Sequence, residues 1–329
     1  MRATHVTRSR RVACALWLTL AATLAPAAPP SESFVEVAGP QGPLKGTLLL
    51  PAEPRAAVLV IPGSGPTDRD GNGPLGLKAS SYRLLAEALS AQGIAVLRFD
   101  KRGLFASAAA VPDANAVTLG DYAEDVRAWA GLLRQRSGLR CTWLLGHSEG
   151  GVVALLAAAR VPDLCGLLLV ATPGRPLGEV LRAQLKANPA NAPLLAPALA
   201  AIAALEQGRR VEVSGLHPAL QGLFNPSLQG FLIDAFSHDP QRLVAAVKRP
   251  VLVLQGQRDL QVQEVDARAL QRALPQARLV LLPGVNHVLK AVAGEDLRAN
   301  VATYADPSLP LAPGVVEAVL DFVGGATRP

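Results

Sequence analysis

The sequence predicts an α/β fold, in which a mostly parallel, twisted sheet has helices on both faces and carries an inserted helical cap. From residue 56 onward, short apolar runs alternate with helical patterns, and this alternation is interrupted once, between about residues 174 and 248. The stretch "LLGHSEGGVVALLAAAR" (144–160) also leads an apolar run into a helical pattern through a turn rich in small residues. These observations favour a chain of βαβ units with one insertion.

The first 27 residues have the pattern of a secretory signal peptide. A start containing four arginines precedes an uncharged apolar run at 12–25, and small residues at 25–27 are suited to cleavage. The apolar run is short for a membrane span. "SRR" at 9–11 is a partial match to a twin-arginine signal. We therefore expect residues 28–329 to be periplasmic or secreted, without stable insertion in a membrane.

The charge balance argues against nucleic acid as a partner. The whole chain has a formal net charge of +6, and removal of the leader, with four arginines and no acidic residue, leaves +2. Most of the basic excess therefore belongs to the export signal rather than to a binding surface. The sequence does not predict the oligomeric state.

The mature chain opens with two strand candidates, 33–39 and 44–51, separated by a Gly-Pro turn. The later strands are continuous apolar runs, which is typical of strands buried on both faces; they are predicted at 56–63, 94–100, 141–148, 164–172, 250–256 and 277–284. The helices have apolar residues at helical spacing, and they are predicted at 81–93, 119–138, 149–160, 265–275 and 314–323.

A candidate nucleophile lies between the strand at 141–148 and the helix that follows. Gly146-His147-Ser148-Glu149-Gly150 fits the G-x-S-x-G pattern in the strand–turn–helix context that a nucleophile elbow requires. The helix N-terminus behind such a serine favours developing negative charge. A serine that only caps the helix is the alternative, but the context favours Ser148 as a nucleophile.

A serine nucleophile needs a base, and the base needs an acid that orients it. His287 follows the last strong strand and is the predicted base, whereas the other histidines of the mature chain lie in the elbow or in the interrupted region. Asp259 follows the preceding strand and is the predicted acid. A structural loop histidine and an aspartate that only forms a turn are the alternatives. The chain order Ser, Asp, His is the one expected for an α/β-hydrolase.

Two backbone N–H groups should form an oxyanion hole. One is that of Glu149, directly after the serine, and the other is that of Ser64 in the loop "IPGSGPTDRDGN", whose glycines permit a close approach. The same loop contains "DRDGN" (68–72), which resembles the start of a calcium-binding loop. Such a loop would need a glutamate where Ala79 stands, so we predict a turn there, with no metal and no cofactor.

Residues 174–248 contain Leu- and Ala-rich helical segments broken by prolines and show no clear strand. Because this stretch lies between two strands of the predicted sheet, we expect it to cap the active site. Phe231 and Leu232 in the cap, and Phe105 outside it, are the predicted pocket residues.

At these residues the chain resembles the α/β-hydrolase superfamily, and within it the bacterial serine aminopeptidase or monoacylglycerol-lipase-like branch, whose members are often carboxylesterases. The matching stretches cover most of the mature chain: "GSGPTDRDGN", "LRFDKRG", "GHSEGG", "LFNPSLQGFLIDAFSHDP", "VLVLQGQRDLQV" and "NHVLK". The resemblance implies Ser148, Asp259 and His287 as the triad. It differs at "RGLFAS" (102–107), where such proteins usually have a second glycine in place of Phe105, a change that we expect to alter the pocket rather than the triad.

These observations favour a secreted serine hydrolase that cleaves small, fairly apolar carboxylic esters through an acyl-serine intermediate. A serine aminopeptidase that acts on short peptides is the alternative, with Glu149 or Glu206 as loose candidates for binding the amine. A binding protein without catalysis on the same fold is a third possibility, which an intact triad disfavours.

Cys141 and Cys165 are the cysteines left after removal of the leader, and each begins an apolar strand. The two strands are joined by one helix, so a right-handed crossover should place them side by side. The spacing of neighbouring strands, about 5 Å, is within disulfide reach, and an oxidising compartment would permit the bond. Two buried free thiols are the alternative.

Overall fold

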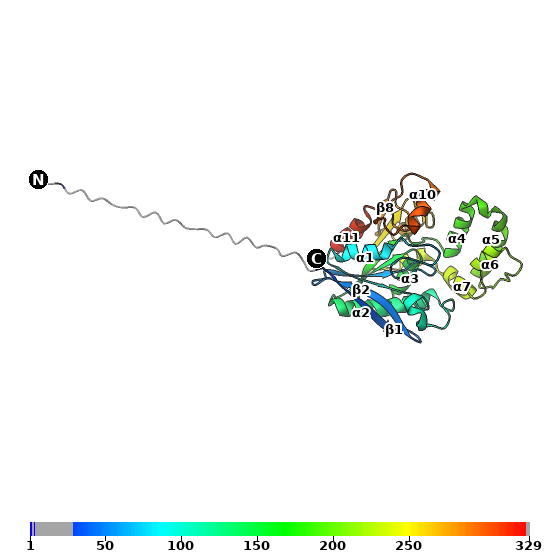
Figure 1. Cartoon of the computed structure of the whole chain (residues 1–329), viewed down its shortest axis with the longest axis horizontal. Helices are drawn as coiled ribbons and strands as arrows, with labels where there is room; N and C mark the ends of the chain where they lie inside the picture. Colours follow the sequence, from blue (N-terminus) through cyan, green and yellow to red (C-terminus); the bar gives the residue numbers. More distant parts are fainter. Residues whose placement is uncertain (2, 4–28, 327–329) are drawn as a thin grey trace.

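The computed structural model describes residues 1, 3 and 29–326 (Figure 1). The predicted signal peptide, apart from two isolated positions, lies outside the described residues. All the helices and strands of the structure therefore belong to the predicted mature chain.

The described residues form one eight-stranded sheet in the order β1-β2-β4-β3-β5-β6-β7-β8. β1 and β2 form an antiparallel hairpin, and β2 pairs antiparallel with β4. All the remaining pairs are parallel. The strands are Ser31–Ala38, Pro43–Leu50, Ala56–Ile61, Ile94–Phe99, Thr142–His147, Leu164–Val170, Val251–Gly256 and Arg278–Leu282. The predicted mostly parallel sheet is confirmed.

Helices cover both faces because the central strands are apolar on both sides. On one face, α1 (Ser81–Ser90) and α11 (Val315–Ala326) pack against residues such as Val96. On the other, α2 (Leu119–Ser137), α3 (Glu149–Ala157), α8 (Pro240–Ala245) and α9 (Glu264–Ala273) pack against residues such as Leu97. Neighbouring residues of β4 thus belong to two separate hydrophobic cores, as the alternating side chains of a strand require.

Within the described residues, the connection from β6 to β7 contains helices joined by loops and no strand, and it stands to one side of the sheet (Figure 1). It contains α4 (Leu177–Ala187), the 3-10 helix η2 (Pro189–Leu194), α5 (Leu195–Glu206), α6 (Pro218–Leu223) and α7 (Gln229–Ser237), followed by α8. Its helices enclose a core of their own that includes Ile202, Leu205 and Phe224. We call residues 174–239 the cap, because α8 packs on the sheet with α3 and α9.

One helical segment among the described residues, Pro189–Glu206, is long and apolar enough to cross a membrane by length and composition. It consists of η2 and α5, and the apolar residues Ala198, Ile202 and Leu205 of α5 are buried in the cap core. Since 28 % of this segment is buried within the molecule, only part of its apolar surface is used for packing in the cap.

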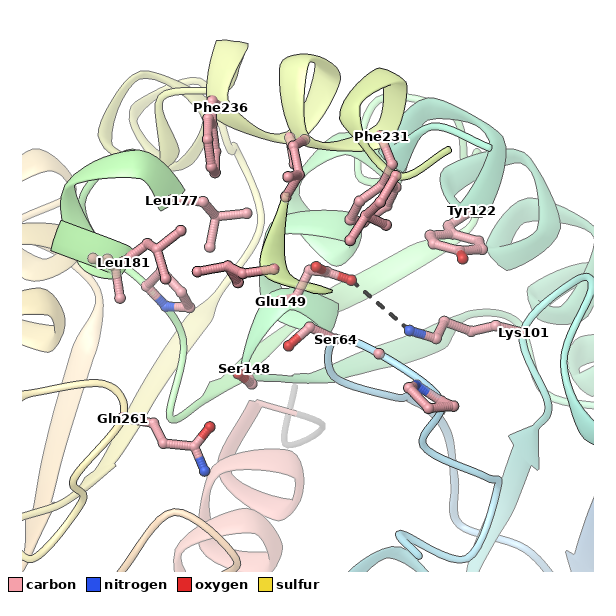
Figure 2. A pocket seen from close by; sticks show the side chains of 18 of the residues that line it. Ser64, Lys101, Tyr122, Ser148, Glu149, Leu177, Leu181, Phe231, Phe236 and Gln261 are labelled. Atoms are coloured by element: carbon pink, nitrogen blue, oxygen red, sulfur yellow. Dashed lines mark ion pairs between the residues drawn. The ribbon is translucent and has the colours of Figure 1, made fainter. Parts of the chain in front are cut away.

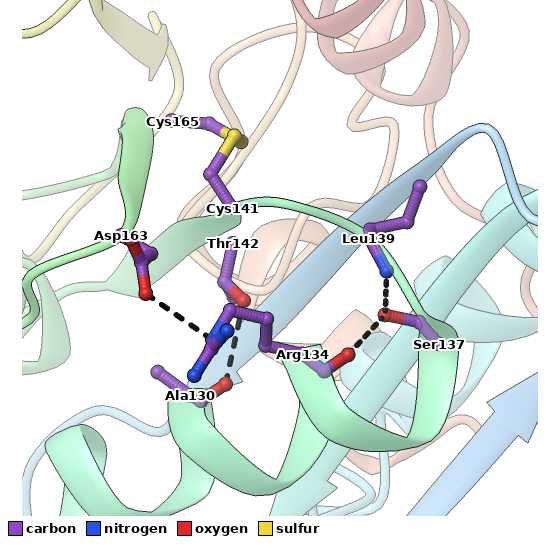
Figure 3. The surroundings of a disulfide bond; sticks show 8 residues. All are labelled: Ala130, Arg134, Ser137, Leu139, Cys141, Thr142, Asp163 and Cys165. Carbon is purple, nitrogen blue, oxygen red and sulfur yellow. Dashed lines mark hydrogen bonds and ion pairs between the residues drawn. A yellow bond between two sulfur atoms is a disulfide. The ribbon is translucent and has the colours of Figure 1, made fainter.

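Cys141 and Cys165 form a disulfide, which is one of the two alternatives that the sequence left open (Figure 3). Their Cα atoms are 5.2 Å apart, at the amino-terminal ends of β5 and β6. Beside the bond, Arg134 of α2 forms a 3.3 Å ion pair with Asp163. The bond therefore joins two central strands at the end opposite Ser148, which follows the last residue of β5.

A loop with a 3-10 helix, η1 (Phe105–Ala110), follows β4, and α10 (Leu297–Ala302) with η3 (Thr303–Ala305) follows β8. These two short regions complete the carboxyl-terminal edge of the sheet, where the candidate site lies.

Candidate active site

The turn at Ser148 has the geometry of a nucleophile elbow. Ser148 has φ 55° and ψ −127°, between the end of β5 and the start of α3. A non-glycine residue in such a strained conformation costs on the order of 1–3 kcal/mol and is typical of functional sites. Within the described residues its hydroxyl accepts no capping hydrogen bond from α3. The helix-cap alternative therefore does not explain this serine.

The flanking glycines are required by close packing. A Cβ at Gly146 would lie 2.3 Å from the carbonyl oxygen of Gly150, and a Cβ at Gly150 would lie 2.4 Å from that of Ile61. A Cβ at Gly151 would lie 2.0 Å from Oγ1 of Thr172. The turn can thus be this sharp, and β3 can lie this close to it, because these positions have no side chain.

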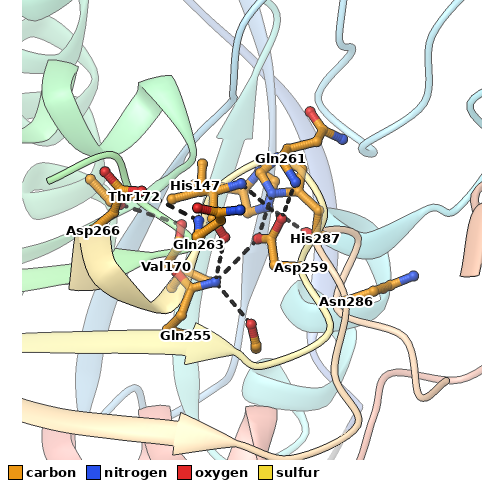
Figure 4. A network of polar contacts seen from close by, with 12 residues as sticks. His147, Val170, Thr172, Gln255, Asp259, Gln261, Gln263, Asp266, Asn286 and His287 are labelled. Atoms are coloured by element: carbon orange, nitrogen blue, oxygen red, sulfur yellow. Dashed lines mark hydrogen bonds and ion pairs between the residues drawn. The ribbon is translucent and has the colours of Figure 1, made fainter. Parts of the chain in front are cut away.

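His287 and Asp259 are brought together from the loops after β8 and β7 (Figure 4). Nδ1 of His287 lies 2.8 Å from Oδ2 of Asp259, and both side chains are buried. The other carboxylate oxygen accepts the N–H groups of Gln261 (2.7 Å) and Val262 (2.9 Å). The aspartate is therefore fixed by its own loop and can hold the imidazole in one orientation.

Ser148 and His287 line one cavity of about 180 Å³, together with Tyr82, Gln261 and Tyr304. In the described residues Ser148 Oγ and the imidazole do not form a hydrogen bond. In free enzymes such catalytic contacts are often long, and they shorten when substrate binds.

His147 lies behind the elbow in a chain of hydrogen bonds. Its Nε2 lies 2.8 Å from the carbonyl oxygen of His287, and its Nδ1 lies 2.8 Å from the hydroxyl of Tyr82. Since the carbonyl only accepts, Nε2 carries the proton and Nδ1 accepts from the hydroxyl. The hydroxyl oxygen in turn accepts the N–H of Gly63 (3.1 Å). Burial lowers the pKa of His147 to about 3, so the ring is neutral.

This chain links the loop of the predicted oxyanion donor to the loop of the predicted base. The sequence pattern assigned His147 to the elbow without giving it a role, and it did not indicate Tyr82. In the sequence, the histidine inside the elbow was the indication of this hydrogen-bonded chain. Its partners could not be recognised from local pattern, because Tyr82 and His287 are 65 and 140 residues away from it.

The oxyanion candidates lie beside the nucleophile. Ser64 lines both cavities that touch Ser148, and Glu149 is the first residue of α3. A Cβ at Gly63 would lie 3.2 Å from Cβ of Ser148, so the loop after β3 comes into direct contact with the elbow.

Lys101 is a buried charged residue that was not predicted from the sequence. It follows β4, is 3 % exposed, and donates to the carbonyl oxygen of Gly63 at 2.6 Å. Its Nζ lies 3.9 Å from Oε1 of Glu149. Burial lowers the pKa of Lys101 and raises that of Glu149, and the attraction between the two opposes both shifts. In the sequence, Lys101 could have been noticed because two charged residues, Asp100 and Lys101, directly follow a buried strand.

A larger cavity of about 420 Å³ lies between the cap and Ser148 (Figure 2). Its walls are mainly apolar side chains of α4 and α7, with Tyr122, Lys101 and Glu149 on the side of the sheet. The side chains from the cap include Leu177, Leu181, Phe231, Leu232 and Phe236.

The two predicted cap residues, Phe231 and Leu232, line this cavity, but Phe105 lines neither cavity at Ser148. The prediction for Phe105 is therefore corrected: its side chain is 41 % exposed, and the neighbouring Leu104 lines the larger cavity instead. Phe105 has φ 45°, a left-handed conformation that favours glycine. The usual glycine is thus explained by the backbone rather than by contact with substrate.

The "DRDGN" segment forms a turn, as predicted. Oδ1 of Asp68 accepts the N–H groups of Asp70 (2.9 Å) and Asn72 (2.8 Å). In the part of the chain that the structure describes, no three His, Cys, Asp or Glu side chains gather in a way that could hold a metal ion.

Sheet, elbow and helical cap together define an α/β-hydrolase fold. Within that class, the sequence profile of the family described as "Serine aminopeptidase, S33" (Hydrolase_4) matches residues 52–290. The chain belongs to this family.

Known proteins with similar sequences or structures agree with the assignment. Esterase EstD of Thermotoga maritima is 28 % identical over 271 residues, which are 80 % of this chain, and the match spans only 62 % of that relative's length. An esterase of Thermogutta terrifontis has a similar fold (TM-score 0.55, 20 % identity, 90 % of this chain and 100 % of the other covered). The α/β-hydrolase GrgF of Penicillium is similar in the same way (TM-score 0.57, 18 % identity, 90 % and 99 % covered). Both structural likenesses concern the fold.

Proposed function

We propose that this protein is an exported serine esterase that cleaves carboxylic esters with apolar acyl groups through an acyl-Ser148 intermediate. One observation carries the proposal: Ser148 lies on a strained elbow between two cavities, and His287, held by Asp259 at 2.8 Å, lines the smaller one. The similarity to Esterase EstD supports esters as the substrate class.

In the proposed reaction Oγ of Ser148 attacks the ester carbonyl while its proton passes to Nε2 of His287. The tetrahedral oxyanion accepts the backbone N–H groups of Ser64 and Glu149. The C–O bond to the alcohol breaks and the imidazolium returns the proton to the leaving oxygen. Water, deprotonated by His287, then attacks the acyl-serine; the bond to Oγ of Ser148 breaks, Oγ takes the proton from the imidazolium, and the acid is released. Asp259 stabilises the imidazolium throughout and keeps its charge.

The position of His287 determines which part of the ester enters each cavity. The leaving oxygen must lie beside the imidazole that protonates it, so the alcohol belongs in the smaller cavity, which His287 lines. The acyl group then lies in the larger cavity beneath α4 and α7, whose walls are mainly apolar. The substrates proposed here are therefore esters of an apolar acid with a small alcohol.

A peptidase needs an unpaired acid to bind the substrate's amino group. Glu149 faces the buried ammonium of Lys101, and Glu206 forms two hydrogen bonds with Arg182. Since neither carboxylate is free of a cation, the site favours esters over N-terminal residues of peptides.

Export to the periplasm or the cell exterior is part of the proposal. The basic, then apolar, leader supports it. The Cys141–Cys165 disulfide also supports it, because such bonds persist in oxidising compartments.

Purified residues 28–329 test the activity. We expect p-nitrophenyl esters to be hydrolysed with kcat/KM rising from acetyl to medium acyl chains, while aminoacyl p-nitroanilides remain uncleaved. Ser148→Ala should lose at least about 10³-fold in kcat and keep the thermal unfolding midpoint. Turnover of the anilides would favour the peptidase, and near-normal ester turnover by Ser148→Ala would contradict the nucleophile. If neither substrate class were cleaved, a binding protein on this fold would be favoured.

A further inference from the structure

Gly63 is the residue before the proposed oxyanion donor, and it is held on both sides by buried groups. Its N–H donates to the hydroxyl of Tyr82 at 3.1 Å, and its carbonyl oxygen accepts from Nζ of Lys101 at 2.6 Å. The carbonyl of Gly63 and the N–H of Ser64 belong to the same peptide unit. In a planar trans peptide these two groups point in opposite directions. Whatever fixes the carbonyl therefore also fixes the direction of the N–H.

We propose that Lys101 is a positioning residue for the oxyanion hole: it holds the Gly63–Ser64 peptide plane so that the N–H of Ser64 faces the substrate oxyanion. The inference rests on Ser148 as the nucleophile but on no particular ester. A glycine without such a restraint has more accessible backbone conformations than any other residue, so the restraint has to come from its neighbours.

The surroundings of Lys101 hold its side chain in place and provide a carboxylate near its ammonium. The side chain is 3 % exposed, and its ammonium lies 5.2 Å from the centre of the Tyr122 ring. The carboxylate 3.9 Å away belongs to Glu149, whose own N–H is the other proposed oxyanion donor. Burial lowers the pKa of Lys101, and this carboxylate counteracts the shift. A buried ion pair is weak evidence for stability, because a well-packed apolar pair often serves as well. Its location between both donors points to a role in the site.

The charge of Lys101 also has a direct effect on the donor. An ammonium on the carbonyl oxygen polarises the peptide, and hydrogen bonds in such a chain strengthen one another. The N–H of Ser64 thus becomes a better donor as well as a fixed one. Because the oxyanion exists only after attack, this contribution appears in kcat rather than in substrate binding.

Lys101→Met tests the proposal, since methionine has similar length without charge or donor. Removing one oxyanion donor costs about 10²–10³-fold in kcat, and misorienting one should cost less. We expect kcat for a p-nitrophenyl ester to fall about 10–100-fold with KM within about threefold. The rate at which a fluorophosphonate labels Ser148 should fall in parallel, because the attacked phosphorus also develops an oxyanion. Lys101→Arg, which keeps the charge and the donors, should recover a measurable part of both rates.

Lys290→Met is the matched control. Lys290 is also fully buried and its Nζ also donates to a backbone carbonyl, that of Leu309, but it does not contact the oxyanion loop. Its folded form should keep kcat and labelling rate within about threefold of wild type. If Lys101→Met does not fold, Lys101→Gln, whose amide is too short to reach Gly63, replaces it.

Three results would overturn the inference: unchanged kcat and labelling in a folded Lys101→Met, an effect on KM alone, or an equal loss in Lys290→Met. An effect on KM alone would mean that Lys101 contacts substrate in the larger cavity. A wild-type protein that is labelled but does not hydrolyse esters would contradict the proposed esterase, and the labelling rates would still decide the role of Lys101. A wild-type protein that is not labelled would contradict both.

Discussion

His147 makes the folded protein sensitive to acid although it takes no part in the proposed chemistry. Its ring is buried and neutral, and both nitrogens are used for hydrogen bonds. Burial, assisted by the neighbouring His287, lowers its pKa from 6.5 to about 3. The unfolded chain therefore binds a proton at a higher pH than the folded one. This contribution to stability is complete above about pH 6.5 and is lost as the pH falls towards 3.

We expect His147→Gln to reduce this dependence. Glutamine can donate to the carbonyl of His287 and accept from Tyr82, but it does not titrate. Between about pH 6 and 4 the free energy of unfolding of the wild type should fall more steeply than that of the variant, by up to about 1.4 kcal/mol per pH unit. Urea denaturation at several pH values measures both slopes. Equal slopes for the two proteins would contradict the role of His147.

At the scale of residues, the sequence predicted the triad candidates but not their supports. Ser148, Asp259 and His287 each follow a recognisable strand, so their places could be read from local pattern. Tyr82 and Lys101 act on Gly63 from 19 and 38 residues away, and their partners are backbone atoms. A contact to a backbone atom leaves no pairing of residue types in the sequence, and only the folded chain shows it.

At the scale of elements, α7 is the part of the cap that joins substrate cavity and sheet. The carboxylate of Asp234 accepts the N–H of Leu119 at 2.7 Å, at the first residue of α2. Phe231, one turn earlier, meets Tyr122 of α2 edge-on, with ring centres 6.4 Å apart. The helix is thus fixed to α2 while Phe231 and Leu232 face the larger cavity.

Phe231→Ala and Leu232→Ala should therefore change acyl-length preference more than stability. Each enlarges the proposed acyl cavity, so kcat/KM should shift towards longer or bulkier acyl groups, by about 10-fold relative to acetyl esters. A panel of p-nitrophenyl esters measures the shift. Phe224→Ala is the control: Phe224 is fully buried in the cap core and does not line the cavity. This control should lose about 3–5 kcal/mol of local packing with an unchanged order of preference. An equal loss for every chain length in the α7 variants would speak against selection by the cap.

The predicted elements of the sheet differ from the observed ones mainly at their ends. The helix predicted at 149–160 ends at Ala157, and the strand predicted at 277–284 is Arg278–Leu282. Apolar runs identify a buried element but not the residue at which its hydrogen bonds stop. The short helix α10 and the 3-10 helix η3 were not predicted. Each is shorter than two helical turns, so no periodic pattern could reveal them.

At the scale of the whole molecule, the disulfide should contribute stability without influencing catalysis. Cys141 and Cys165 are separated by 24 residues, and closing a loop of that size is worth about 3 kcal/mol. We expect Cys165→Ala, or reduction of the wild type, to lower the free energy of unfolding by about that amount. The kcat of the folded fraction should stay unchanged, because the bond lies at the far end of β5.

Denaturant titration with and without reductant measures the loss. Intact mass after alkylation provides the check on the bond itself: the denatured mature protein should take up two alkyl groups only after reduction. Two groups added without reduction would show that the cysteines are free in solution.

The cap has one more property, which follows from where it is inserted in the chain. The chain leaves the sheet after β6 and re-enters it at β7, and these strands are direct neighbours, with Val170 paired to Leu254. The cap is therefore a single excursion from one connection of the sheet, whereas the elbow, the imidazole loop and the oxyanion loop lie at the ends of other strands. Excursions of this kind can be exchanged as modules. A cap from another member of the family could be grafted between β6 and α8, giving a new substrate range while the catalytic residues stay unchanged.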